Sequence, residues 1–66
     1  MQIKYFQDTD TLLINFNNNT IYETKDINEN VLVELDKAGN VVSMTFEHAK
    51  NVADINDFSY QQLAMA

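Results

Sequence analysis

The chain has 66 residues and a net charge of −6, from ten acidic residues against four lysines, and it contains no cysteine. This length makes one small domain and excludes a multi-domain enzyme, while the lack of cysteine excludes disulfides and thiolate-bound zinc. Hydrophobic residues make up 45% of the chain, which is enough for a small packed core. Domains of this size often need a disulfide, a metal or a partner, so a partner subunit is the expected source of extra stability.

Charge and hydropathy also bear on the partners and the location of the chain. The four lysines are scattered and arginine is absent, which argues against direct binding of nucleic acid. No stretch approaches the ~18–20 apolar residues that span a membrane, and the N-terminus lacks a signal pattern. We therefore expect a cytoplasmic protein with no membrane partner.

Alternation of apolar and polar residues is the main pattern of the first 50 residues. It predicts five strands, at 2–6, 11–17, 20–25, 30–36 and 41–47. The links between them are short and polar, and such links join antiparallel neighbours only. The expected fold is mainly β (α+β), with residues 1–50 forming an antiparallel meander of about five strands.

The C-terminal part has a different period. Asn56 or Asp57 is a plausible N-cap for a helix that begins at Phe58. Ten helical residues are marginal alone. We therefore expect residues 51–66 to form a short helical segment that packs on the sheet or on a partner.

Two groups of residues are candidates for binding a partner protein. Glu34 and Asp36 alternate with apolar residues of the fourth strand, so they form either an acidic recognition patch, with Glu23 nearby, or an ordinary solvent face. Aromatic and large apolar residues crowd the last nine positions, where they serve as an interface anchor or as core. These residues are Phe58, Tyr60, Leu63 and Met65.

Catalytic, metal and cofactor sites are not expected. Asp8 and Asp10 form an Asp-x-Asp pair that could bind a cation or act as acid and base, but the other ligands of a calcium loop are missing. Turn formation is the favoured interpretation of this pair. The single histidine, His48, is expected to be a surface or capping residue after the fifth strand.

Several spaced motifs of the chain match a known family. They are Ile3-Lys4-Tyr5, Asp8-x-Asp10-x-Leu12-x-Ile14-x-Phe16, Glu23-Thr24, Val31-Leu32-Val33-Glu34-Leu35-Asp36, Gly39-Asn40-Val41-Val42, Met44-x-Phe46 and Ala49. Over residues 1–50 the chain resembles the domain-of-unknown-function family twenty-two eighty-three, which consists of short bacterial and archaeal proteins. Ala38 and Met44 depart mildly from the family pattern, and the segment 51–66 lies outside it.

This resemblance implies a small β-rich fold without a catalytic motif. Some relatives look like antitoxins encoded beside small toxins that resemble ribonucleases. It therefore implies a non-catalytic protein-binding module, the antitoxin of a type II pair that binds and neutralises a basic ribonuclease-like toxin. The alternative is a small self-assembling, homodimeric protein without a toxin partner, paired through a sheet edge or face.

Overall fold

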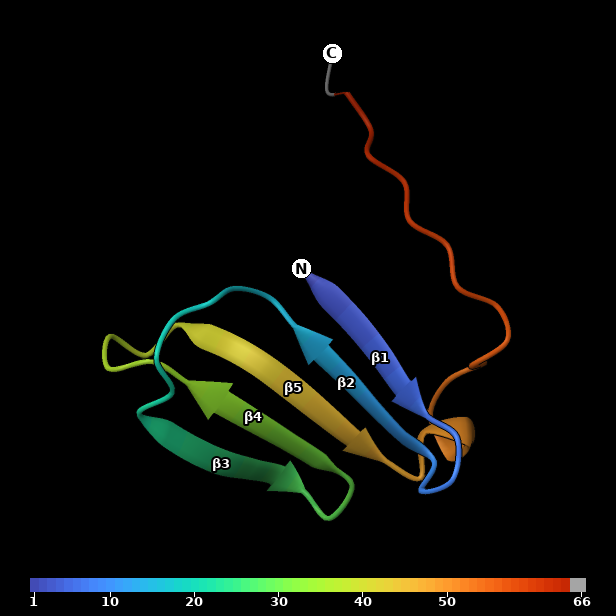
Figure 1. Cartoon of the computed structure of the whole chain (residues 1–66), viewed down its shortest axis with the longest axis horizontal. Helices are drawn as coiled ribbons and strands as arrows, with labels where there is room; N and C mark the ends of the chain where they lie inside the picture. The colour runs from blue at the N-terminus through green and yellow to red at the C-terminus, as the bar shows by residue number, and fades with distance from the viewer. Residues whose placement is uncertain (65–66) are drawn as a thin grey trace.

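The computed structural model describes residues 1–64, which form one open sheet and a C-terminal tail (Figure 1). The strands are β1 (Gln2–Phe6), β2 (Thr11–Asn15), β3 (Glu23–Asn28), β4 (Val31–Leu35) and β5 (Val41–Glu47). A single 3₁₀ turn, Ala49–Asn51, follows β5. Every neighbouring pair of strands is antiparallel, so the predicted mainly β, five-stranded antiparallel fold is confirmed.

The strand order differs from that of a simple meander. It is β1-β2-β5-β4-β3, so β5 lies between β2 and β4, and β2 is not a neighbour of β3. In β5, Phe46 lies opposite Leu12 and Met44 lies opposite Ile14. Central placement gives these large side chains a neighbouring strand on each side, whereas a meander would leave β5 at the edge of the sheet. The last four strands form a Greek-key arrangement.

The segment 16–22 makes the crossing from β2 to the far edge of the sheet. Its backbone continues the ladder at both ends, because Phe16 N donates to Val42 O at 2.8 Å and Tyr22 N donates to Leu35 O at 2.8 Å. Between them, Asn17 Nδ2 donates to the carbonyl oxygen of Val41 at 3.0 Å. Strand β3 begins at Glu23, three residues after the predicted start at residue 20.

The register of the strands gives the sheet two chemically different faces, because residues opposite each other in antiparallel strands point to the same side. We call one side the apolar face; it carries Ile3, Tyr5, Leu12, Ile14, Val31, Val33, Leu35, Val41, Met44 and Phe46. We call the other side the polar face; it carries Gln2, Lys4, Leu13, Asn15, Thr24, Asp26, Leu32, Glu34, Ser43 and Thr45.

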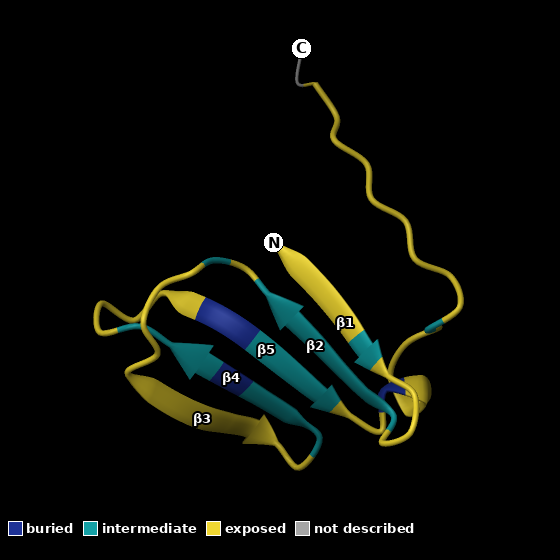
Figure 2. Ribbon diagram, viewed as in Figure 1, coloured by how far each residue is buried: buried dark blue, intermediate teal, exposed yellow. Residues whose placement is uncertain are grey.

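The core is thin because the sheet has only one layer. Among the described residues, the buried ones are Val33, Val42, Ser43 and Ala49. They lie near the middle of β4, in β5 and in the 3₁₀ turn, while β3 is exposed along its whole length (Figure 2). Most other residues of the apolar face are half-buried, since no second layer covers them.

The predicted C-terminal helix is not present in the described part of the tail. Residues 52–64 contain turns and extended chain but no helix. In Figure 1 the tail turns near the end of β1 and then leads away from the sheet. An isolated helix of this length lacks the packing surface that would offset the free-energy cost of its nucleation. The helical spacing of the apolar residues is therefore not sufficient to form a helix in the tail.

Candidate protein-binding surfaces

The tail presents large apolar side chains to solvent. Phe58 and Tyr60 are each 67% exposed, and Leu63 is 78% exposed. The interpretation of these three residues as core of their own domain is therefore wrong. Their exposure on an extended segment fits the alternative interpretation, an anchor for a partner. Met65, the fourth candidate, lies outside the described residues.

The first part of the tail lies against the apolar face. Residues 53–55, 57 and 58 line a groove of about 320 Å³ together with side chains from β1 and β2. Ile55 is half-buried there, beside Leu12 and Ile14. Asp54 shapes this part of the tail, since its carboxylate accepts a hydrogen bond from Asn56 N at 3.2 Å and its carbonyl accepts one from Asp57 N at 3.1 Å. This part of the tail thus lies over β1 and β2.

The two predicted acidic residues, Glu34 and Asp36, occupy different environments. Glu34 lies on the polar face of β4, where Oε1 accepts a 2.5 Å hydrogen bond from the hydroxyl of the buried Ser43. Asp36 follows the end of β4 and belongs to the hairpin turn before β5. Glu23, expected close by, lies opposite Leu35 and so on the other face of the sheet. Glu23 is therefore not part of a patch with Glu34, whereas a binding role for Glu34 and Asp36 stays a prediction.

Asp36 instead organises the turn between β4 and β5. Its carboxylate accepts hydrogen bonds from Asn40 N at 2.8 Å, Ala38 N at 3.0 Å and Asn19 Nδ2 at 2.9 Å. The backbone bond from Asn40 is the main cause that lowers the pKa of Asp36 below its ordinary value, and the side chains of Asn40 and Asn19 add to it. Gly39 completes the turn with a φ of +88°, which a residue with a side chain rarely adopts.

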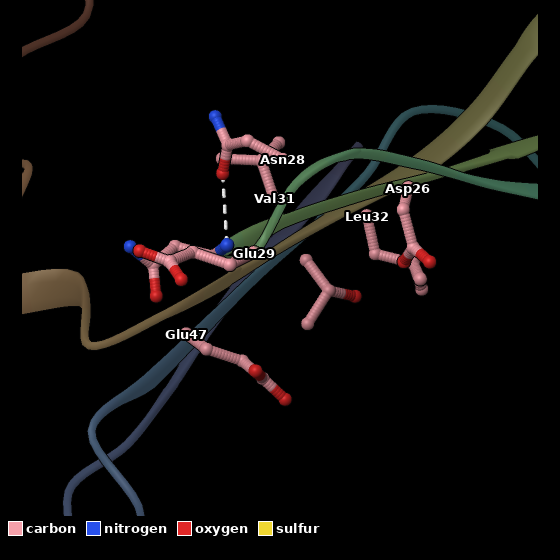
Figure 3. A pocket seen from close by; sticks show the side chains of 8 residues that line it. Asp26, Asn28, Glu29, Val31, Leu32 and Glu47 are labelled. Atoms are coloured by element: carbon pink, nitrogen blue, oxygen red, sulfur yellow. Dashed lines mark hydrogen bonds between the residues drawn. The ribbon is translucent and has the colours of Figure 1, made fainter.

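A second acidic surface was not expected from the sequence. Asp26, Glu29 and Glu47 line a hollow of about 110 Å³ beside Leu32 (Figure 3). The β3–β4 turn that forms one wall is held by a 2.8 Å bond from Asn30 N to Asn28 Oδ1. These acids come from three segments that only the strand order brings together, so no local sequence pattern could have shown the hollow.

The three carboxylates give this hollow an acidic character, because their charges gather at one small concave site. Among residues 1–64, no group of three or more His, Asp or Glu residues is arranged to hold a metal ion. The hollow is an acidic surface at a different place from the Glu34 and Asp36 surface expected above.

Asp8, Asp10 and His48 have structural roles in the turns. Asp8 Oδ1 accepts a hydrogen bond from Thr9 N at 3.1 Å, and Asp10 adopts a positive φ of 54° in the same turn. The interpretation of this pair as turn-forming is confirmed. His48 also has a φ of 54° just before the 3₁₀ turn, and its Nδ1 lies 2.9 Å from Asn30 Oδ1.

Comparison with known proteins places the chain in one family. The family model described as "Protein of unknown function (DUF2283)" matches residues 2–50, which include all five strands. The chain therefore belongs to the DUF2283 family, as its motifs indicated. No curated protein and no solved structure matches it. In the part of the chain that the structure describes, no helix has the length and hydropathy of a membrane span.

Proposed function

We propose that this member of the DUF2283 family is a non-catalytic protein-binding module, and most concretely the antitoxin of a type II toxin–antitoxin pair. The proposal rests chiefly on the tail, where Phe58, Tyr60 and Leu63 are each at least 67% exposed. Large aromatic and aliphatic side chains exposed on an extended segment are typical anchors for a partner surface. The resemblance of some relatives to antitoxins supports the more specific role.

The proposed partner is a basic, ribonuclease-like toxin. A protein that cleaves RNA carries basic residues, because it has to attract phosphate groups. The net charge of −6 accelerates the encounter with such a protein. The hollow lined by Asp26, Glu29 and Glu47 would then receive one basic side chain of the toxin.

The tail and the hollow contribute to recognition in different ways. Charge complementarity mainly raises the association rate and sets specificity, whereas buried aromatic anchors slow dissociation. Inhibition requires no chemistry by the chain, only that the bound module masks the RNA-binding surface of the toxin. The location of the complex is proposed to be the cytoplasm, where a ribonuclease would meet its RNA.

Co-expression with the adjacent open reading frame tests this proposal. We expect a heteromeric complex, and we expect growth arrest when the neighbouring protein is expressed alone. The control is the neighbour expressed with a chain that ends after Asn51, which retains the sheet and the 3₁₀ turn. A neighbour that is harmless alone and does not bind the full chain would contradict the antitoxin role.

A further inference from the structure

We propose that the groove between the tail and the apolar face, called the tail groove below, binds one arginine side chain of the basic partner. The groove has a volume of about 320 Å³. This volume is at the lower end of the range for ligand pockets, so the groove has room for a long side chain but not for a folded element. The inference rests on the proposed function, because it names the group of the basic partner that this surface receives.

Most of the tail groove is lined by apolar and aromatic side chains. They come from β1, β2 and the tail, and they are Ile3, Tyr5, Leu12, Ile14, Ile55 and Phe58. The methylene stems of arginine and lysine pack along apolar surfaces of this kind while the charged head stays in water. The rings of Tyr5 and Phe58 also suit a cation, which is attracted to the face of an aromatic ring. The lining therefore fits a side chain with an apolar stem and a cationic end.

A turn in the tail brings two carboxylates to this groove. Asp57 N donates to the carbonyl oxygen of Asp54 at 3.1 Å, which is the bond between the two ends of a β-turn and keeps their Cα atoms within about 7 Å. Ile55, inside the turn, is half-buried beside Leu12 and Ile14 and so fixes the turn against the sheet. Both acids line the groove together with the apolar side chains.

Charge complementarity selects a cationic occupant. Among residues 1–64, those that line the tail groove include Asp54 and Asp57 but no basic residue, and neither acid forms an ion pair. Lys4, the charged residue of β1, lies on the polar face opposite Leu13. A neutral apolar side chain would fill the groove but leave both carboxylates without a counter-charge. Arginine fits better than lysine, because its planar guanidinium stacks on aromatic rings and donates two parallel hydrogen bonds to a carboxylate.

The tail groove is continuous with the proposed anchor residues. Phe58 lines the groove and also begins the exposed apolar part of the tail, which contains Tyr60 and Leu63. A partner that packs on these residues is therefore within reach of the groove. The acidic hollow shares no lining residue with the tail groove, so it would receive a separate basic side chain.

An NMR titration of the full chain alone with N-acetyl-arginine methylamide tests this site. We expect the amide signals of Ile14, Ile55 and Asp57 to shift, with a dissociation constant on the order of 1 mM. N-acetyl-citrulline methylamide has nearly the same shape without the charge, and it should bind about tenfold more weakly. The corresponding lysine derivative should lie between the two. Equal affinity for the arginine and citrulline derivatives, or the absence of any shift, would overturn the inference.

Two variants locate the binding of the arginine derivative. Asp57→Asn removes one carboxylate and keeps its shape, so it should weaken binding about threefold. Asp26→Asn, in the acidic hollow, is the matched control and should leave the affinity unchanged. Asp54 is less suitable, because its carboxylate also accepts the hydrogen bond from Asn56 N at 3.2 Å. A loss of affinity in Asp26→Asn but not in Asp57→Asn would place the arginine in the hollow and overturn the inference.

The inference and the proposed function can fail separately. If Asp57→Asn binds the co-expressed neighbouring protein as tightly as the wild type does, the tail groove does not receive an arginine of that partner, and the antitoxin role is unaffected. If the chain binds the arginine derivative as expected but does not bind the neighbouring protein, the antitoxin role is contradicted, and the arginine site in the groove is retained.

Discussion

The hydroxyl of Tyr5 donates a 2.6 Å hydrogen bond to Oδ1 of Asp10, and this contact ties β1 to the turn that follows it. The same carboxylate accepts from Lys50 N at 3.2 Å and 3.3 Å, and the carbonyl of Asp10 accepts from Ala49 N at 3.0 Å. Asp10 therefore connects the N-terminal hairpin to the 3₁₀ turn that begins the tail. Asp10 makes these contacts with a positive φ of 54°.

We predict that Tyr5 ionises late in an alkaline titration. The hydrogen bond to Asp10, followed by burial and by the negative charge of Asp10, raises the pKa of Tyr5 from 10.0 to about 12. Because the raised pKa favours the protonated phenol in the folded state, its stabilising effect is full below pH 10.0 and is lost as the pH rises through about 12. The tyrosinate absorbance should show this late step.

Two variants test whether the ionisation step at high pH belongs to Tyr5. Tyr5→Phe should remove it, and Asp10→Asn should move it to lower pH, because the amide has no charge. Titration curves of the wild type and Tyr5→Phe that share the same final step would contradict the assignment.

Replacement of Asp10 should destabilise the fold. Asp10→Ala removes the acceptor of Tyr5 and Lys50 and places a side chain without local hydrogen bonds at a positive φ, so we expect a loss of about 1–3 kcal/mol. Asp10→Asn is the matched control, since it keeps an acceptor oxygen and tolerates this conformation. Urea unfolding should give a smaller loss for Asp10→Asn than for Asp10→Ala. Equal losses would show that the charge, and not the geometry of the turn, supplies the stability.

The periodicity of the sequence was sufficient for the strands but not for their order. Four of the five predicted ranges overlap the observed strands closely, because each apolar row lies on one face of the sheet. The place of β5 beside β2 depends on contacts between Leu12 and Phe46, and between Ile14 and Met44, which are more than 25 residues apart. Alternation fixes which face a residue occupies, but it carries no information on which strand becomes the neighbour.

The candidate sites were predictable only where the signal is local. Phe58, Tyr60 and Leu63 were found from the crowding of apolar residues, although the helix expected to carry them is absent. The acidic hollow was missed, because Asp26 and Glu47 are distant in sequence. Asp36 appeared to be a strand residue, but four hydrogen bonds to its carboxylate hold it in the turn.

We predict that Asp36 makes the fold sensitive to acid. The hydrogen bonds from Asn40, Asn19 and Ala38 lower its pKa below the ordinary 3.8, so the carboxylate is the form that the fold prefers. Its stabilising effect is therefore full above pH 3.8 and is lost as the pH falls through the lower folded pKa. Asp36→Asn should show a weaker loss of stability over this acidic window in thermal unfolding. An unchanged acid dependence would contradict this role.

The thin core makes the few buried side chains important. Val42 is 2% exposed, so Val42→Ala should cost about 1.5–3 kcal/mol of stability, because it removes two buried methyl groups, worth about 0.8 kcal/mol each, and leaves a cavity. Val52, which is 52% exposed, provides the matched control, and Val52→Ala should change stability by less than about 0.5 kcal/mol. Urea midpoints of the two variants measure the difference. A similar small effect in both would contradict the central role of Val42 in the core.

The tail can be tested with two tyrosines of nearly equal exposure. Tyr60 is 67% exposed in the tail, and Tyr22 is 68% exposed in the segment between β2 and β3. If the tail anchors the basic partner, Tyr60→Ala should weaken the complex by about 2 kcal/mol, a roughly thirtyfold change in Kd, because anchors in a desolvated pocket dominate binding. Tyr22→Ala should change Kd little.

Phe58→Ala with Leu63→Ala should weaken the complex further and leave the unfolding midpoint of the isolated chain unchanged, since both side chains are exposed there. Calorimetric titration of each variant into the partner measures the effect, and equal affinities for Tyr60→Ala and Tyr22→Ala would show that the partner is bound elsewhere.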